Sequence, residues 1–290
     1  MSTPTARTEQ AAGRRDAHIE RPEIRRTSLL SQSLVITRRN LIHIRRMPEM
    51  LLDVTIQPVM FVLLFAFVFG GSIAVGGSPA GYREWLMAGI MGQTIAFASF
   101  IVAVGLTADI DKGIVDRLRS LPINPAAVLL GRSISSLLHS SIGVVIMSLT
   151  GLAVGWRIRE GVLDAILAYA LLLSWGFAMI WVGILVGSAM RSVEAVNGLM
   201  FATMFPITFL ADTFAPTEAM PGFLRTIAEW NPLSSLVQAV RELWGNDVPV
   251  GPDAALPLQH PVLSTLIWVA VITAVTAPLA LRAFARRTAD

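Results

Sequence analysis

Charged residues divide this chain into long apolar stretches separated by short polar segments. Six stretches of 17 to 29 residues contain no Asp, Glu, Lys or Arg: 54–82, 85–108, 133–156, 165–190, 195–211 and 254–281. A helix needs about 20 mostly apolar residues to cross a bilayer core, and a central charge costs about 2.5–3.5 kcal/mol. The pattern predicts an all-α membrane protein with six transmembrane helices. The fifth stretch is the shortest, and reaches the lower limit for a crossing only if Phe214 and Ala215 extend it.

Composition agrees with a membrane protein. The chain is 54% hydrophobic and 15% charged, with mean hydropathy +0.63, whereas soluble domains are about 25% charged. The absence of Cys excludes a disulfide framework and a thiolate metal site. The four His residues, at positions 18, 43, 139 and 260, lack ligand spacing, so we expect no metal site and no enzyme activity in this chain.

The distribution of cations predicts the orientation. If the N-terminus is cytoplasmic, 18 of the 23 Lys and Arg residues lie on the cytoplasmic side and 5 lie outside. The positive-inside rule then places both termini in the cytoplasm. No basic stripe with interleaved aromatic residues indicates nucleic-acid binding, so membrane lipid is the expected partner of the Arg pairs.

The segments outside the apolar stretches divide the chain into four regions. Residues 1–27 are polar and are expected to be a disordered cytoplasmic tail. Residues 28–49 predict an amphipathic helix on the membrane surface, with Leu30, Leu34, Leu41 and Ile44 on one face. This helix either anchors the first transmembrane helix or takes part in gating. Residues 50–285 form the predicted six-span permease domain, and 286–290 form a cytoplasmic tail.

The loop between the second and third spans predicts a short amphipathic helix on the cytoplasmic side. Ile110, Ile114, Val115, Leu118 and Leu121 recur at helical spacing, and the charged residues cover the other face. A solvated connector and a docking element for a partner both fit this pattern.

A second pair of helices is predicted between the fifth and sixth spans. Asn231 is a good N-cap, Pro232 suits the first helical position, and Gly245 follows the last periodic residue. Phe223 and Ile227 indicate a shorter helix before it. We expect two half-buried helices in the outer leaflet; an external amphipathic cap without a part in transport is the alternative.

A chain that binds ATP itself and a transporter driven by an ion gradient would each leave a signature in the sequence. A nucleotide-binding P-loop needs Gly-Lys-[Ser/Thr], but the single lysine, Lys112, lies between Asp111 and Gly113, so ATP must be bound elsewhere. A gradient-driven transporter places ionisable groups at mid-membrane, where this chain offers only His139, more often a packing residue than a proton relay. We therefore expect no cofactor in this chain.

Two motifs resemble the type-2 ABC exporter permeases, especially the daunorubicin-resistance permease group. One is the run from Asp111 to Pro122 with Ala127 to Arg132; the other comprises residues 219–225 and 231–241. The resemblance implies a homodimeric plasma-membrane permease that exports a hydrophobic or amphipathic compound. It also implies a separate ATP-binding cassette ATPase, which binds ATP and magnesium. Lipid or glycan export by the same scaffold is the alternative, with a gradient-driven transporter as a further one.

The resemblance assigns two sets of site residues. The first set is a coupling helix that docks on the ATPase: Asp109, Asp111, Lys112, Gly113, Asp116, Arg117, Leu118, Ser120, Leu121 and Pro122. In the family, the second and fifth spans border the translocation path. Together with a polar residue of the first span, this gives the path residues Gln57, Gln93, Phe97, Phe100, Asn197, Phe201 and Phe205. Packing roles are the alternative for each of these seven.

Overall fold

The computed structural model describes residues 28–46, 52, 55–69, 79–115, 124–247 and 249–287, and these are helical or irregular without any strand. The predicted 1–27 tail lies outside them. In chain order the helices are α1 (Leu29–Arg46), α3 (Ile56–Leu63), the π-helix η1 (Leu64–Phe69), α4 (Pro79–Asp111), α6 (Pro125–Val154), α7 (Val162–Ala189), α8 (Val193–Phe209), the 3-10 turn η2 (Thr217–Ala219), α9 (Gly222–Glu229), α10 (Pro232–Trp244), α11 (Leu256–Gln259) and α12 (Pro261–Arg287). The all-α prediction is confirmed for these residues.

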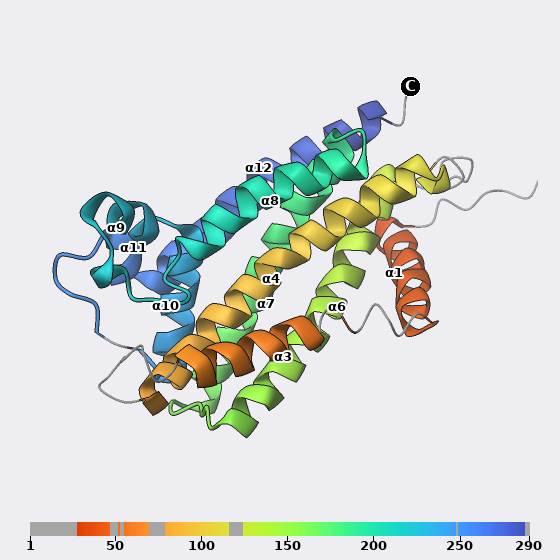
Figure 1. Ribbon diagram of the computed structural model, residues 1–290. Coiled ribbons are helices and arrows are strands. Elements are labelled where there is room, and N and C mark those ends of the chain that lie inside the picture. Colours follow the sequence, from red (N-terminus) through yellow and green to blue (C-terminus); the bar gives the residue numbers. More distant parts are fainter. Residues whose placement is uncertain are drawn as a thin grey trace, which may run out of the picture.

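Four helices are long and apolar enough to cross a membrane, namely α4, α6, α7 and α12. The first and fifth predicted spans correspond to shorter apolar helices, Ile56–Val68 and Val193–Phe209. The long helices run side by side in Figure 1 and give the bundle two ends. We call the end that holds α1 and the last turn of α12 the α1 end, and the opposite end, with α9, α10 and α11, the α10 end.

Several helix ends differ from the ends of the charge-free stretches. Helix α4 begins at Pro79 and ends at Asp111, so it includes charged residues at both ends. Asp109 therefore continues the second span, and does not begin a separate surface helix as predicted. The helix stops because Gly113 adopts φ 66°, and its N–H bonds to the Ile110 carbonyl at 2.9 Å. Helix α12 runs to Arg287, past the end of the sixth charge-free stretch at residue 281.

The helix in the fifth apolar stretch also ends earlier than the sequence suggested. Helix α8 stops at Phe209, so Phe214 and Ala215 do not extend it. The chain turns there because Asp212 is buried beneath α10, where its side chain and backbone bind Arg241.

Helices α4 and α7 pack closely because small residues line their contact. A Cβ atom at Gly183 would lie 2.2 Å from the Ser99 carbonyl oxygen, and one at Gly187 would lie 2.6 Å from that of Ala103. The hydroxyl of Thr107 donates to the Gly187 carbonyl at 3.0 Å. Inside a membrane, helix contacts depend on such close approach, because lipid tails are as apolar as the side chains they replace. This pair forms the centre of the bundle.

Helix α1 packs against α6 through polar residues. The Thr37 hydroxyl donates to the Gly131 carbonyl at 3.1 Å, and both residues are buried. Two residues of the predicted apolar stripe face the other way: Leu30 and Leu34 are 71% and 61% exposed. An exposed apolar stripe of this kind suits a helix that lies against lipid.

Helix α10 begins and ends at the residues that the sequence predicts. The Asn231 side chain accepts a hydrogen bond from the Leu233 N–H at 2.9 Å, Pro232 follows at the first position, and Gly245 stops the helix with φ 66°. The predicted apolar face is fully buried: Leu233, Leu236, Val237, Val240 and Trp244. The apolar residues of α9 and its C-cap are exposed instead: Phe223, Ile227 and Trp230.

Candidate functional site

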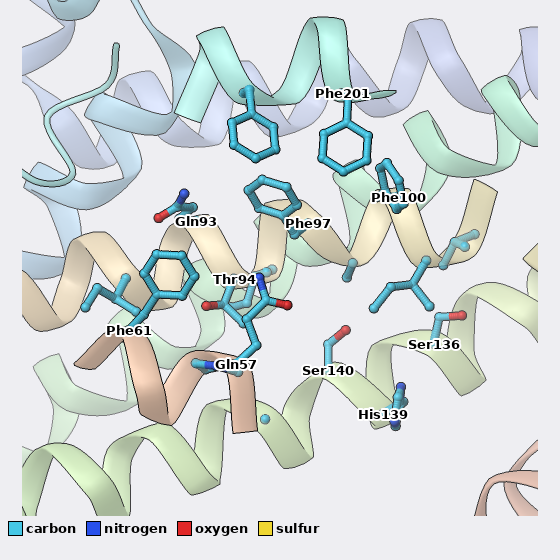
Figure 2. Close-up of a pocket in the computed structure, with 18 of the residues that line it drawn as sticks. Gln57, Phe61, Gln93, Thr94, Phe97, Phe100, Ser136, His139, Ser140 and Phe201 are labelled. Atoms are coloured by element: carbon cyan, nitrogen blue, oxygen red, sulfur yellow. The ribbon is translucent and has the colours of Figure 1, made fainter. Parts of the chain in front are cut away.

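A cavity of about 360 Å³ lies between α3, α4, α6 and α8. Ligand pockets are typically about 300–1,000 Å³, so this cavity is large enough for a small organic molecule. Figure 2 shows side chains from these helices around it. None of the described lining residues is Asp, Glu, Lys or Arg. The cavity therefore offers no fixed counter-ion to a charged ligand.

Aromatic rings from α4 and α8 form one wall of the cavity. Phe97 meets Phe205 edge to face, with ring centroids 5.8 Å apart, and Phe100 meets Phe201 in the same way at 5.2 Å. Phe201 and Phe205 also stack on each other, with centroids 5.2 Å apart. Such rings favour an aromatic guest, because they offer both faces and edges for further offset or T-shaped contacts.

Polar but uncharged side chains form the opposite wall, contributed by α3, α4 and α6. They are Gln57, Thr94, Ser136, His139 and Ser140, whereas Gln93 lies on the same side of α4 as Phe97 (Figure 2). Gln93 is only 6% exposed although its side chain is an amide. A cavity with one aromatic and one hydrogen-bonding wall suits an amphipathic molecule better than a purely apolar one.

Six of the seven predicted path residues line this cavity: Gln57, Gln93, Phe97, Phe100, Phe201 and Phe205. Asn197 is partly buried near the start of α8 and is not among the lining residues. Sequence reasoning did not place Ser136, His139 or Ser140 on the path, and it gave His139 a packing role. The spacing of these three residues could have indicated a shared surface, because residues three and four apart lie on one face of a helix.

The base of the predicted coupling region is held by two ion pairs, which we call the α1-end pairs. Asp109 pairs with Arg132 of α6, and Asp111 pairs with Arg287 of α12 at 3.0 Å. Arg287 also donates to the Gly187 carbonyl of α7 at 2.9 Å. Four helices therefore meet at this point.

The remaining predicted coupling residues divide into two groups. Lys112 is exposed and Gly113 forms the turn after α4. The other six lie outside the described residues: Asp116, Arg117, Leu118, Ser120, Leu121 and Pro122.

A buried charge pair joins helices at the α10 end. Arg241 is 0% exposed, and its guanidinium donates to the Asp212 carboxylate at 2.6 Å and to the Asp212 carbonyl at 2.7 Å. It also donates to the Trp85 carbonyl at 2.9 Å and lies 3.6 Å from the centroid of the Trp85 ring. The sequence analysis placed Arg241 only among the cations predicted to lie outside. The residues next to it in the chain do not indicate its contacts with Asp212 and Trp85.

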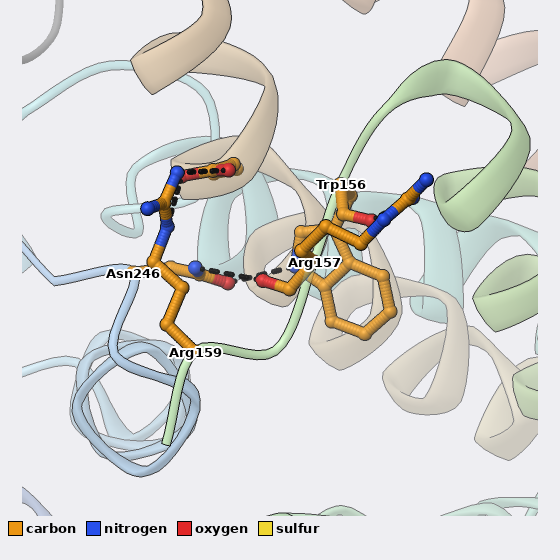
Figure 3. A network of polar contacts seen from close by, with 5 residues as sticks. Trp156, Arg157, Arg159 and Asn246 are labelled. Carbon is orange, nitrogen blue, oxygen red and sulfur yellow. Dashed lines mark hydrogen bonds and ion pairs between the residues drawn. The ribbon is translucent and has the colours of Figure 1, made fainter.

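The α6–α7 loop is attached to the same end. The Trp156 indole donates to the Asn246 side chain at 2.8 Å, and Asn246 donates to the Arg157 carbonyl at 3.0 Å (Figure 3). Arg159 donates to both carboxylate oxygens of Glu84, at 2.7 and 3.0 Å. These hydrogen bonds raise the pKa of the Arg159 guanidinium above its ordinary value. The loop thereby links α4 to the end of α10.

A helical membrane bundle with an uncharged cavity between its helices has the architecture of a permease. Residues 31–243 match the family model described as ABC-2 type transporter, so the chain belongs to the ABC-2 type transporter family. The expected family is confirmed. Members of this family are membrane permease subunits of ATP-binding cassette transporters. Among the described residues, no group of three His, Asp or Glu side chains could hold a metal ion.

Curated relatives cover most of the chain. It is 30% identical to the daunorubicin resistance ABC transporter permease protein DrrB1 of Streptomyces coeruleorubidus, over 77% of this chain and 78% of the relative. It is 23% identical to the probable doxorubicin resistance ABC transporter permease protein DrrC of Mycobacterium tuberculosis, over 87% of this chain and 88% of the relative. It is 22% identical to the putative transport permease ycf38 of Cyanophora paradoxa, over 75% of each chain.

Proposed function

We propose that this chain exports an amphipathic, drug-like aromatic compound, with ATP hydrolysed by a separate ATP-binding cassette subunit. The uncharged cavity with its aromatic wall carries the proposal. Two relatives that cover most of the chain are named for resistance to daunorubicin and doxorubicin, which agrees with such a cargo.

The proposed topology has six crossings with both termini in the cytoplasm. Helix α3 with η1 and helix α8 supply the two shorter crossings. The excess of cations on the α1 side supports a cytoplasmic α1 end and an outer-leaflet α10 end. In this arrangement the exposed apolar α1 stripe meets the cytoplasmic leaflet.

The proposed assembly is a homodimer with two ATPase subunits. Helix α8 exposes Leu199, Phe201 and Phe205, and α3 exposes Met60. A second copy that covered these residues would close the open side of the cavity. This would place the translocation path between the two permease subunits.

Coupling is proposed to run through residues 109–122. The α1-end pairs support this assignment, because they join the base of the loop to α6 and α12. A push from the ATPase on this loop would therefore reach three helices and not α4 alone.

Transport in proteoliposomes tests the proposed function. The full chain should be inert alone and should move 1,4-dihydroxyanthraquinone, a fluorescent aromatic probe, when its partner ATPase and ATP are present. A proton or sodium gradient without ATP should give no flux. Gradient-driven flux through the chain alone, or failure of ATP to drive any probe, would contradict the proposal.

Two substitutions test the coupling assignment. Asp111→Arg reverses a charge at the base of the loop, and Gly113→Pro forbids the positive φ of the turn. Both should abolish most ATP-driven transport while membrane insertion stays unchanged. Asp253→Arg, at an exposed acidic residue of the α10 end, is the matched control and should transport normally. Full transport by both test variants would count against the assignment.

Lipid export is a second candidate, favoured by another cavity. This cavity, of about 600 Å³, lies between α7, α8, α10 and α12, and its lining is almost wholly apolar, with Trp175, Met204 and Ile272 among the residues. Such a site suits an acyl chain better than a polar drug. ATP-driven movement of a fluorescent phospholipid, without movement of the aromatic probe, would favour this function over drug export.

A further inference from the structure

Helix α8 separates two cavities. We call the cavity between α3, α4, α6 and α8 the first cavity, and the cavity of about 600 Å³ between α7, α8, α10 and α12 the second cavity. Phe201 and Phe205 of α8 line the first cavity, whereas Met204 and Ile207 line the second. The two linings share no residue in the described part of the chain. The second cavity is therefore a separate space, and its occupant need not be the cargo.

The second cavity offers almost nothing to a polar molecule. Besides the Trp175 indole, its described lining contains only Asn231 and Thr276 as polar side chains, and both bond within the protein. Asn231 donates to the Ile207 carbonyl at 2.6 Å, and Thr276 donates to the Ile272 carbonyl at 2.7 Å. A buried water needs several polar partners, and protein interiors rarely keep empty spaces larger than a water molecule. The lining thus calls for an apolar occupant.

The mouth of the second cavity shows which apolar molecule can reach it. Ile207 of α8 and Val271 and Val275 of α12 belong to the lining and are also exposed. In a bilayer, exposed apolar faces of such helices contact acyl chains and not water. The cavity therefore opens toward lipid between α8 and α12.

Helix α9 places one end of the second cavity at the membrane surface. Ile227 of α9 lines the cavity, and the neighbouring Phe223 and Trp230 are exposed. Exposed aromatic side chains on an amphipathic helix are typical of the membrane–water interface. From α9 the lining continues along α7 to Val182 and along α12 to Thr276, near the middle of both helices. This course suits a chain that hangs inward from a headgroup.

Toward the α1 end, side chains fill the space between the same helices. Ala280 and Phe284 of α12 pack with Ile184 of α7 in one buried cluster. The first half of α8 is buried at Val196 and Met200. The second cavity is thus closed at its inner end. A chain that enters from the leaflet at the α10 end has no way through to the other leaflet.

We propose that the second cavity holds an acyl chain of a bilayer phospholipid, which comes from the leaflet at the α10 end and stays bound as a resident chain. The apolar lining, the mouth that faces lipid and the closed inner end carry this inference. It is independent of drug export. It also gives the cavity a role different from lipid export, because a closed pocket holds a chain but offers it no exit.

Photo-labelling of the purified full-length chain in nanodiscs tests the inference. The probe is a phosphatidylcholine with a diazirine at the end of an acyl chain, mixed at rising fractions into unlabelled phosphatidylcholine, and labelled peptides are mapped by mass spectrometry. A site saturates, whereas lipid that merely surrounds the protein labels it in proportion to the probe fraction. Labelling of residues 204–210 and 271–276 should saturate. Labelling of 142–149, where α6 exposes Ile142, Val145 and Leu149, should rise in proportion.

A pair of tryptophan variants links the saturable labelling to the second cavity. Ile272→Trp enlarges a partly buried side chain of the lining, and should abolish the saturable labelling because the ring occupies the space of the chain. Leu266→Trp is the matched control, since it adds the same ring to an exposed position of α12 outside the lining, and should label as wild type does. Thermal unfolding checks that both variants are folded, and the wild-type saturation curve tests the site without either of them.

Labelling of 271–276 in proportion to the probe fraction would overturn the inference, and so would saturable labelling that survives in folded Ile272→Trp. With the partner ATPase present, ATP-driven transfer of the probe from this site to the opposite leaflet would make the cavity an export route and overturn the resident role. The proposed drug export fails separately. Saturable labelling in a complex that moves no aromatic probe with ATP would support the lipid site and contradict drug export.

Discussion

The two ends of the bundle hold their charged residues in opposite ways. At the α10 end, Arg241 and Asp212 form a pair that is buried from solvent, and the Arg241 guanidinium makes four contacts there. At the α1 end, Asp111 and Arg287 form a pair whose side chains are 42% and 18% exposed. Breaking a buried pair is costly, whereas an exposed pair contributes little to stability. The comparison indicates a fixed α10 end and an α1 end that rearranges at small cost.

Removing one partner of the buried pair should have the largest effect. Arg241→Met leaves Asp212 buried without its cation, and should destabilise the protein by about 3–5 kcal/mol. Thermal unfolding of the detergent-solubilised protein measures this loss. The matched control is Arg287→Met, which breaks the pair with the 42% exposed Asp111 at the α1 end. Equal destabilisation by the two variants would break the comparison.

A neutral hydrogen bond at the α10 end should have an intermediate effect. Trp156→Phe keeps most of the ring but leaves the Asn246 side-chain oxygen without its donor, at a cost of about 1–2 kcal/mol. The same unfolding assay detects it. The pairing of Trp156 with the Trp244 ring should survive, since their T-shaped contact does not use the indole N–H. No change in stability would mean that this loop does not contribute to the rigidity of the end.

A charge swap at the α1 end should change stability little and transport strongly. Asp111→Arg alone places two cations together and should uncouple ATP hydrolysis from transport, while stability falls by less than about 1 kcal/mol. Adding Arg287→Asp restores the pair and should restore transport. Arg286→Asp, at the exposed neighbouring position, should not rescue it. A double variant as defective as Asp111→Arg would show that Asp111 acts on the ATPase and not on α12.

The smallest effect is expected from an exposed pair at the rigid end. Arg159 binds Glu84 from the surface, so Arg159→Gln should leave the unfolding temperature unchanged within error. This variant separates position from burial, because Arg159 and Arg241 both lie at the α10 end but only Arg241 is buried. A clear destabilisation would mean that the end of the bundle at which an ion pair lies, and not its burial, determines how much its loss destabilises the protein.

Local signals predicted the parts of the fold that depend on neighbouring residues. Asn231, Pro232 and Gly245 specify the two ends of α10 through capping and backbone preference, which act within a few residues. The spacing of charged residues predicted which segments form long helices, but not the residues at which these helices begin and end. Asp109 and Asp111 extend α4 because charged side chains at a helix end reach beyond the apolar layer and do not break the helix.

Contacts between distant segments could not be read in the same way. In α1, the apolar stripe with Leu30 and Leu34 predicted a surface helix, but nothing in it indicated that the face with Thr37 packs on α6, because helix packing beside lipid depends on close fit and hydrogen bonds. Ser136 and Ser140 were not predicted as cavity residues for a related reason. Whether a membrane serine faces a helix or a cavity depends on which helices lie opposite, and the sequence alone does not state this.

The close contact between α4 and α7 limits how the cavity can change shape. With no room for even a methyl group between Gly183 and Ser99, the two helices cannot slide past each other and must move as one body. Phe97 and Gln93 belong to α4 and move with it. Opening or closing the cavity therefore requires α3, α6 or α8 to move relative to the α4–α7 pair. The glycines of α7 thus hold α4 and α7 together as the rigid part of the subunit.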